Sequence, residues 1–492
     1  MSEPDDPRDD HPHAPPSGHG HTHSPSAIAV HMQPTVARVV VGLIIAAAVA
    51  VVVGAIVLWP SHRQHEVPVQ FQSSAPDGRL ATATGTVIAQ TRSACLNRQA
   101  GTVFGGAAQV TPTDDGPCIQ STVRITSGKD TDANTLVEVP TNRAQSGTAP
   151  GTVAQNFTPS QLDQVQPGQP SLGLGDKIRL VVSPGSDGAA SYAFYDYSRG
   201  TSTIIWALLF VAAIVLVAAW RGLRSVIGLV IAFVVLLGFT LPAILDGKSP
   251  VAVAITSSAA ILLIVIYLAH GVSLRTSAAL LGTLASLGVA AVLSYLSVET
   301  MHITGLSGEQ TTNLQVYQNG ISTNGILLAG FIIGALGVLN DVTITQASAV
   351  FELAGGGRTR RASFAAAMRV GRDHIASTVY TLVFAYAGSA LPLLLLFSVA
   401  GQSFSNLATT DTVAVELARS FVGGIAIALS VPLTTAIAVA LVHRHERPDG
   451  KRGHRPVPPP TPPRSQPPRS QPPRPAEPQA PAARRSRHSL PD

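Results

Sequence analysis

Residues 203–220 read TIIWALLFVAAIVLVAAW, a run without a charged residue or a proline. A helix rises about 1.5 Å per residue, so this run would span about 27 Å, close to the ~30 Å hydrocarbon core of a bilayer. Arg221 and Arg224 follow it directly, and a second apolar run starts at Ser225. The stretch therefore predicts a membrane-spanning helix that ends at a polar boundary.

The whole chain has the composition of a membrane protein. Of its 492 residues, 46% are hydrophobic and only 12% are charged, whereas about a quarter of the residues are charged in soluble proteins. The mean hydropathy is +0.28. This composition excludes a typical water-soluble enzyme of the same length.

Eight segments pass the same test of length and apolarity, and they predict an α-helical polytopic membrane protein with about eight transmembrane helices. The segments are 36–59, 203–220, 225–245, 251–269, 276–298, 325–345, 375–399 and 419–442. We interpret the first as an uncleaved anchor rather than a signal peptide, because Trp59, Pro60 and His62 follow it instead of a small-residue cleavage site.

The basic residues predict an orientation, because Lys and Arg concentrate in cytoplasmic loops. The loops after the second, fourth and sixth helices are rich in arginine: Arg221, Arg224, Arg275, Arg358, Arg360, Arg361, Arg369 and Arg372. The connections on the other side, residues 247–250, 299–323 and 400–418, hold a single lysine and no arginine. We expect a multi-pass cell-membrane protein with both termini in the cytoplasm.

Residues 61–200 are predicted to form a small extracytoplasmic β-rich domain between the anchor helix, 36–59, and a seven-helix transmembrane domain, 203–442. Short β-rich runs separated by turn signals favour a barrel or a sandwich. The runs are 85–90, 122–126, 135–139, 177–182 and 192–197.

Cys95 and Cys118 are the only cysteines of the chain, and both fall in this predicted outer domain. Outside the cytoplasm a disulfide is chemically allowed, and we favour it over two free thiols. Two cysteines are too few for a four-cysteine zinc site or an iron–sulfur cluster. The sequence therefore predicts a disulfide and no resident metal or other cofactor.

The two ends of the chain, residues 1–35 and 443–492, are predicted to be disordered cytoplasmic tails. The first contains five histidines, which are either simply solvated or bind metal ions adventitiously: His11, His13, His19, His21 and His23. The second is rich in Pro and Arg, and its 11 Lys/Arg against 4 Asp/Glu give it a charge of +7, so the rest of the chain contributes −2 to the net +5. It either contacts anionic lipid headgroups, binds an aromatic-lined groove or only adds solubility. The charge therefore does not indicate a nucleic-acid partner.

Polar residues at the end of the sixth predicted helix are the candidate intramembrane site, because ionisable groups in a bilayer are costly. If the helix continues, Asp341, Thr345, Ser348 and Glu352 lie on one face, with Asn340 beside them. Such a face must contact protein or water rather than lipid.

Arg372 and Asp373, just before the seventh predicted helix, are the candidate partners of this polar face. Two interpretations of Asp341 remain open. It is either a cation or proton site, or a structural residue that pairs with Arg372 or caps another group near the cytoplasmic surface.

Two predicted helices contain residues that favour breaks. Gly388, Ser389 and Pro392 predict a kink in the seventh helix, and the stretch from Ser430 to Thr435, with Pro432 inside it, predicts a similar break in the eighth. Broken helices of this kind expose backbone carbonyls at membrane depth.

Motifs for enzyme chemistry are absent from the sequence. There is no Gly-x-x-x-x-Gly-Lys-Ser/Thr loop, no His-Glu-x-x-His and no Gly-x-Ser-x-Gly. We therefore expect neither an ATP-driven pump within this chain nor an enzyme.

Three stretches carry a resemblance to a known family: Gly334–Val342 (GALGVLNDV) running on to Glu352–Leu353, Gly371–His374 (GRDH) and Thr381–Pro392 (TLVFAYAGSALP). Gly175–Lys177 and Tyr195–Arg199 of the outer domain add to it. With these motifs the chain resembles the YibE/F family of bacterial multi-pass membrane proteins over about residues 85–442. The resemblance implies an inner-membrane, permease-type protein without an assigned substrate, so no site residue is carried over.

Our leading hypothesis is a permease that transports an unidentified substrate. The competing hypothesis is a scaffold or envelope-associated protein that transports nothing and whose outer domain binds a partner.

Overall fold

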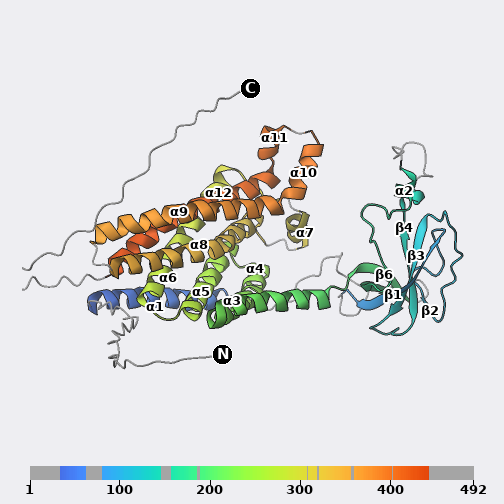
Figure 1. Cartoon of the computed structure of the whole chain (residues 1–492), viewed down its shortest axis with the longest axis horizontal. Coiled ribbons are helices and arrows are strands. Elements are labelled where there is room, and N and C mark those ends of the chain that lie inside the picture. Colours follow the sequence, from blue (N-terminus) through green and yellow to red (C-terminus); the bar gives the residue numbers. More distant parts are fainter. Residues whose placement is uncertain are drawn as a thin grey trace, which may run out of the picture. The chain divides into compact units, whose positions relative to one another are not determined.

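The computed structural model describes residues 34–61, 80–145, 157–184, 189–306, 309–317, 321–355, 359–401 and 403–442 (Figure 1). The N-terminal histidines and the whole Pro/Arg-rich segment 443–492 lie outside the described residues. The described part contains one β-sheet and one bundle of helices.

Six strands form a single antiparallel sheet with the order β2-β4-β3-β1-β5-β6. The strands are β1 (Thr82–Ser93), β2 (Val103–Phe104), β3 (Cys118–Ile125), β4 (Asn134–Pro140), β5 (Lys177–Pro184) and β6 (Ala190–Tyr197). The five predicted β-rich runs fall on β1, β3, β4, β5 and β6. β1 is long enough to pair with both β3 and β5, and a bulge between Val87 and Ala89 bends it.

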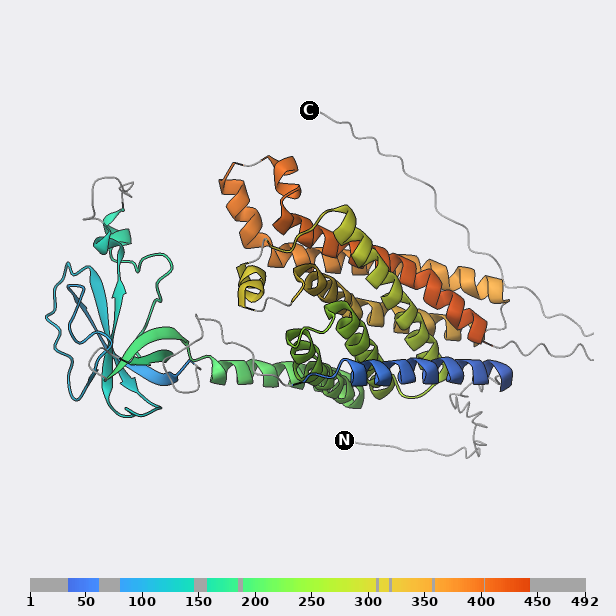
Figure 2. The same ribbon diagram turned by 180° about the vertical axis from the view of Figure 1, so that it is seen from behind.

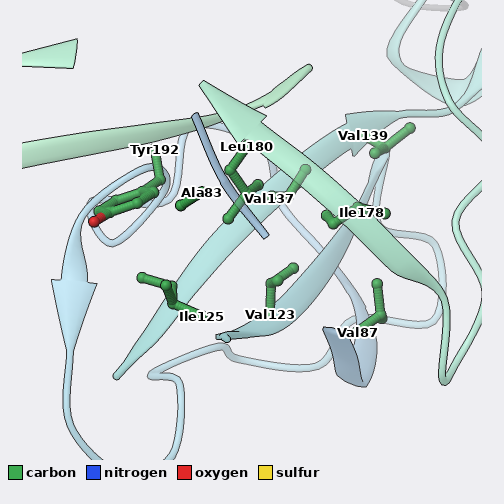
Figure 3. Close-up of a cluster of buried hydrophobic side chains, with 9 residues drawn as sticks. All are labelled: Ala83, Val87, Val123, Ile125, Val137, Val139, Ile178, Leu180 and Tyr192. Carbon is green, nitrogen blue, oxygen red and sulfur yellow. The ribbon is translucent and has the colours of Figure 1, made fainter. Parts of the chain in front are cut away.

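The sheet closes on itself through the segment before β2. Ala100 forms a parallel bridge with Leu136 of β4, and the carbonyl oxygen of Gly101 accepts the backbone N–H of Tyr192 from β6 at 2.7 Å. The β2–β4 side of the sheet therefore meets β6 at the opposite edge. Of the barrel and the sandwich that the sequence left open, the sheet forms the barrel. Figure 3 shows the buried side chains that it surrounds: Ala83, Val87, Val123, Ile125, Val137, Val139, Ile178, Leu180 and Tyr192.

A disulfide joins Cys95, just after β1, to Cys118 at the start of β3, with 5.2 Å between the Cα atoms. Glu138 of β4 reinforces the same corner, because its carboxylate accepts the backbone N–H groups of Leu96 at 2.9 Å and Asn97 at 3.1 Å. The chain that leaves β1 is thus held both covalently and by hydrogen bonds.

Asp163, beside the short helix α2 (Pro159–Leu162), links the loops of the barrel through arginines. Its carboxylate accepts hydrogen bonds from Arg143 at 2.6 Å and from Arg92. These two guanidinium groups, Arg143 above all, hold the pKa of the Asp163 carboxyl below its usual value.

The helical part consists of twelve elements within the described residues: α1 (Pro34–Val57), α3 (Gly200–Val235), the π-helix η3 (Leu236–Thr240), α4 (Leu241–Leu245), α5 (Pro250–His270), α6 (Leu274–Thr300), α7 (Glu309–Tyr317), α8 (Thr323–Gly355), α9 (Arg360–Ser389), α10 (Leu391–Val399), α11 (Phe404–Ala408) and α12 (Asp411–Leu441). Among the described residues, six helical segments are long and apolar enough to cross a membrane, or seven if α9 and α10 together form one bent span. This makes the chain a membrane protein.

The predicted helices 203–220 and 225–245 follow each other within the segment Gly200–Leu245 as two helices that meet at a kink, without a loop between them. The break falls on one residue, Ala219, at φ 49° and ψ −133°. Gly222 fits this turn because it lacks a Cβ atom, which would lie 2.5 Å from the carbonyl oxygen of Ile214. Past this residue the polar stretch around Arg221 keeps its helical hydrogen bonding, so no loop forms.

Several helices extend beyond the apolar boundaries predicted for them, because polar residues can continue a helix outside the bilayer. α8 continues to Gly355, and α9 already begins at Arg360, so most of the predicted basic loop is helical. The predicted kink is present, since α9 and α10 meet at 57°. The predicted break in the last helix is wrong, because α12 runs through Pro432 without interruption.

The core of the bundle is formed by α6, α8 and α12, and α9 lies beside α12 along one edge (Figures 1 and 2). Polar side chains join these helices. Thr283 of α6 and Thr343 of α8 share a hydrogen bond of 2.5 Å. Gln346 of α8 donates to Thr435 of α12 at 2.7 Å and to the carbonyl oxygen of Ala367 in α9 at 3.0 Å. These bonds fix the relative height of the four helices.

Candidate intramembrane polar site

Four residues of the predicted polar face lie on one side of α8. Asp341, Thr345 and Glu352 are exposed, and Ser348 is half-buried. Two of these side chains are satisfied by their own helix, because Thr345 donates to the carbonyl oxygen of Asp341 and Ser348 to that of Ile344. Asp341 and Glu352 are therefore the residues of this face that present charge.

His374 of α9 is the ionisable neighbour of Asp341, with 4.0 Å between its Nε2 and Oδ2 of the carboxylate. The Asp341 side chain is 70% exposed and that of His374 is 31% exposed. No ion pair joins Asp341 to Arg372 among the described residues, so the predicted pairing with Arg372 is not formed.

Helix geometry explains why His374, and not Arg372, lies next to Asp341. Gly371 is buried against Val431 and Gln346, and Arg372, one residue later, is rotated by about 100° away from that packed side. Arg372 and Asp373 are therefore exposed, whereas His374 returns toward α8. The candidate residues fall into two groups: Asp341 beside His374, and Arg372 with Asp373 on the outer side of α9.

The hydrogen bonds between helices give the depth of Asp341 in the bundle, because two residues that share a bond lie at the same level. Thr283 lies about 12 Å along α6 from Arg275, and Asp341 lies about 3 Å further along α8 than Thr343, its bonded partner. Measured instead through Thr435, Asp341 lies about 16 Å from the end of α12 at Leu441. Both estimates place Asp341 about 15–16 Å from that end of the bundle, measured along the helix axes.

A second charged group lies on α12 toward the other end of the bundle. Arg419 makes two hydrogen bonds of 3.0 Å with the carboxylate of Glu416. Its guanidinium also lies 5.5 Å from the ring centre of Phe331 in α8 and 5.6 Å from that of Tyr386 in α9. Phe331 is about 15 Å along α8 from Asp341. Three helices thus meet around one arginine.

The sequence does not single out the group around Arg419, and it offers His374 only as a plausible partner beside Arg372 and Asp373 at the start of the seventh predicted helix. Arg419 marked only the boundary of the last predicted helix, and Tyr386 and Phe331 are ordinary in apolar runs. The available signal was the Glu-x-x-Arg spacing of residues 416 and 419, which places both side chains on one helix face.

Three glycines continue the exposed side of α8 between the two charged groups. Gly334 faces the hydroxyl of Tyr386, 3.3 Å from where a Cβ atom would stand. A Cβ atom at Gly330 or Gly337 would meet no other atom within 4 Å. On this side, α8 therefore presents its backbone rather than side chains from the level of Phe331 to that of Asp341.

Two other features have the form of a binding site. A cavity of about 320 Å³ at the start of α8 is lined by Val298, Glu299, His302, Ile303, Thr304 and Asn324. In the described part of the chain, one group of three possible metal ligands lies close together, Cys95, Cys118 and Glu138. The disulfide removes both thiolates from that group, so it offers a metal ion one carboxylate.

A comparison with protein-family models finds a match for most of the helical part. The family model described as YibE/F-like protein matches residues 206–444. This region runs from α3 to the end of α12, whereas the expected resemblance of the outer domain is outside the match. No curated protein and no solved structure matches the chain.

Proposed function

With residues 206–444 assigned to the YibE/F-like family, we propose that this membrane protein is a permease for a small ionic or polar solute. The observation that carries the proposal is the pair of Asp341 and His374 halfway along the helices. A carboxylate beside a titratable imidazole can bind and release a proton or another cation.

The bilayer position of this pair follows from α6. Arg275 and Glu299 are the only charged residues of α6, and they lie about 36 Å apart along its axis. This distance is slightly more than the ~30 Å of a hydrocarbon core. Asp341, about 15 Å from the level of Arg275, then lies close to the bilayer centre. An ionisable group at that depth is costly unless it has a functional partner.

We propose eight membrane crossings. Gly200–Leu245 would be about 69 Å long if straight, more than twice the thickness of the hydrocarbon core. The break at Ala219 divides it into two crossings. Counting α9 with α10 as one bent crossing then gives eight.

The proposed orientation, with both termini in the cytoplasm and the barrel outside, rests on the arginines near residues 221, 275 and 360–361. A reporter fused after Thr323 should read as extracytoplasmic, because α8 begins there. A cytoplasmic signal from that reporter would contradict the orientation of the whole helical part. A fusion after His270, at the end of α5, serves as the matched cytoplasmic control.

The bend between α9 and α10 supports a transport function. It lies just after Tyr386, which contacts Arg419, so a change in this bend would alter the outer group of charges. Broken helices are typical of transporters that bind ions near the bilayer centre. We propose that Asp341 binds the transported or coupling cation and that α10 moves during access from outside.

Flux into proteoliposomes tests the proposal. The full chain is reconstituted and offered a panel of protons, mono- and divalent cations and small organic solutes, with empty liposomes as control. Transport of at least one of these above the control supports a permease. No flux for the whole panel, together with a knockout phenotype reproduced by deleting residues 61–200, would favour the scaffold that binds a partner through its outer domain.

A further inference from the structure

The outer side of α8 and α9 carries charges that a single chain leaves uncovered, from the level of Asp341 and Arg372 near the bilayer centre to that of Glu352 and Arg361 at its edge. We define the open face of α8 as Gly330, Gly334, Gly337, Asp341, Thr345 and Glu352, all of which are exposed. The exposed side of α9 next to it carries Arg361, Arg369 and Arg372. At the level of Asp341 and Arg372, such a face must be covered by protein or water rather than by lipid.

The two helices have opposite charge. α8 holds Asp341 and Glu352 and no Lys or Arg, whereas the arginines of α9 outnumber its single acid, Asp373. Within one chain, the ion pair between the two helices among the described residues is that of Asp341 with His374. The arginines on the outer side of α9 are therefore available to another acidic helix.

The charges also match in position. The bond between Gln346 and the carbonyl oxygen of Ala367 marks one level on both helices. Because α8 and α9 run in opposite directions, Asp341 and Arg372 both lie five residues, about 7.5 Å, from that level on one side. Glu352 and Arg361 both lie six residues, about 9 Å, from it on the other side.

The acids and the arginines share the same spacing of eleven residues, which is close to three helical turns. Asp341 and Glu352 therefore lie on one face of α8, and Arg361 and Arg372 on one face of α9. A two-fold axis along the membrane normal preserves depth, so it can bring the acids of one chain against the arginines of another at both levels.

We propose that the open face of α8 docks on α9 of a second copy of this chain, with Asp341 opposite Arg372 and Glu352 opposite Arg361. The face is self-complementary, as a two-fold interface requires. The bare glycines of α8 let the second helix approach closely, as small residues do between membrane helices. The dimer removes the uncovered charges from lipid. The contact uses the same carboxylate as the proposed cation site, so Arg372 of the second copy and a cation compete for Asp341.

Disulfide cross-linking of the full chain in liposomes tests the proposed contact. Both native cysteines are joined in the disulfide, so an introduced cysteine is the only free thiol. Gly337 and Ala376 both lie nine residues from the Gln346–Ala367 level, and both are exposed. Chains carrying Gly337→Cys are mixed with differently tagged chains carrying Ala376→Cys. A mixture of Gly337→Cys with Leu429→Cys, an exposed residue of α12 at similar depth, is the control.

A charge swap tests the register independently. Glu352→Arg should raise the dimer dissociation constant about ten-fold or more, because it places like charges opposite each other. Adding Arg361→Glu in the same chain should restore the wild-type value. We expect cross-linking of 337 with 376, little of 337 with 429, and rescue by the swap. A wild-type chain that stays monomeric on dilution in liposomes, cross-linking equal to the control, or a swap that does not rescue would each overturn the proposal.

Discussion

Asp341→Asn is expected to lower solute flux by roughly 100-fold, the rate equivalent of about 2.7 kcal/mol. The amide keeps the size of the side chain but can neither carry a proton nor balance a cation beside His374. The fold should change little, because the Asp341 side chain is 70% exposed and its helix packs through other residues. The initial rate of uptake into proteoliposomes, with the solute identified in the panel, measures the effect.

Thr345→Val is the matched control for this substitution. Thr345 is exposed one turn further along the same face of α8, and its hydroxyl donates to the carbonyl oxygen of its own helix. Flux should therefore stay within about two-fold of wild type, since a surface change of this kind is nearly neutral. Equal flux for wild type and Asp341→Asn would remove Asp341 from the transport site.

Removing the disulfide by Cys95→Ala with Cys118→Ala should lower the unfolding free energy of the barrel by about 3–4 kcal/mol on the chain-entropy model. The bridge closes a loop with a sequence separation of 23, and Cys118 is buried at the start of β3. Pulse proteolysis of the full chain in urea, following cleavage between β1 and β6, measures the midpoint.

The control for the disulfide is Leu174→Ala, which truncates a side chain that is already 68% exposed in the same domain. Its midpoint should equal that of wild type. Treatment of the wild-type chain with a reductant should shift the midpoint as the double substitution does. An unchanged midpoint in both experiments would show that the bridge does not stabilise the barrel.

Local patterns in the sequence predicted most of the secondary structure. The alternation of Lys177–Val182 predicts β5, and the apolar run from Val251 predicts α5. Gly388 and Pro392 predict the bend before α10, because both weaken helical hydrogen bonding at one place. In contrast, Pro432 leaves α12 intact. A proline thus accompanies a bend in one helix and leaves another continuous. The difference depends on packing, here of α12 against α6 and α8, and a local sequence pattern does not contain that information.

The interactions between helices could not be predicted in the same way. Gln346 bonds to Thr435, which is 89 residues away, and to Ala367 on a third helix. Such partners depend on which faces meet after folding. For the same reason the sequence identified Asp341 as a costly polar residue but could not choose His374 over Arg372 as its partner. It also did not predict the contacts of Arg419 with Phe331 and Tyr386.

A spin label at Leu429→Cys is the most direct test of whether Asp341 lies near the bilayer centre. Leu429 is exposed on α12, six residues from Thr435, whereas Asp341 is five residues from Gln346, the bonded partner of Thr435. The label therefore reports the depth of Asp341 without changing the site. In liposomes we predict collisions with oxygen well in excess of those with a water-soluble nickel complex, and a depth of about 15 Å, half of a hydrocarbon core. A label that collides mainly with the nickel complex, as in the headgroup region, would contradict the account.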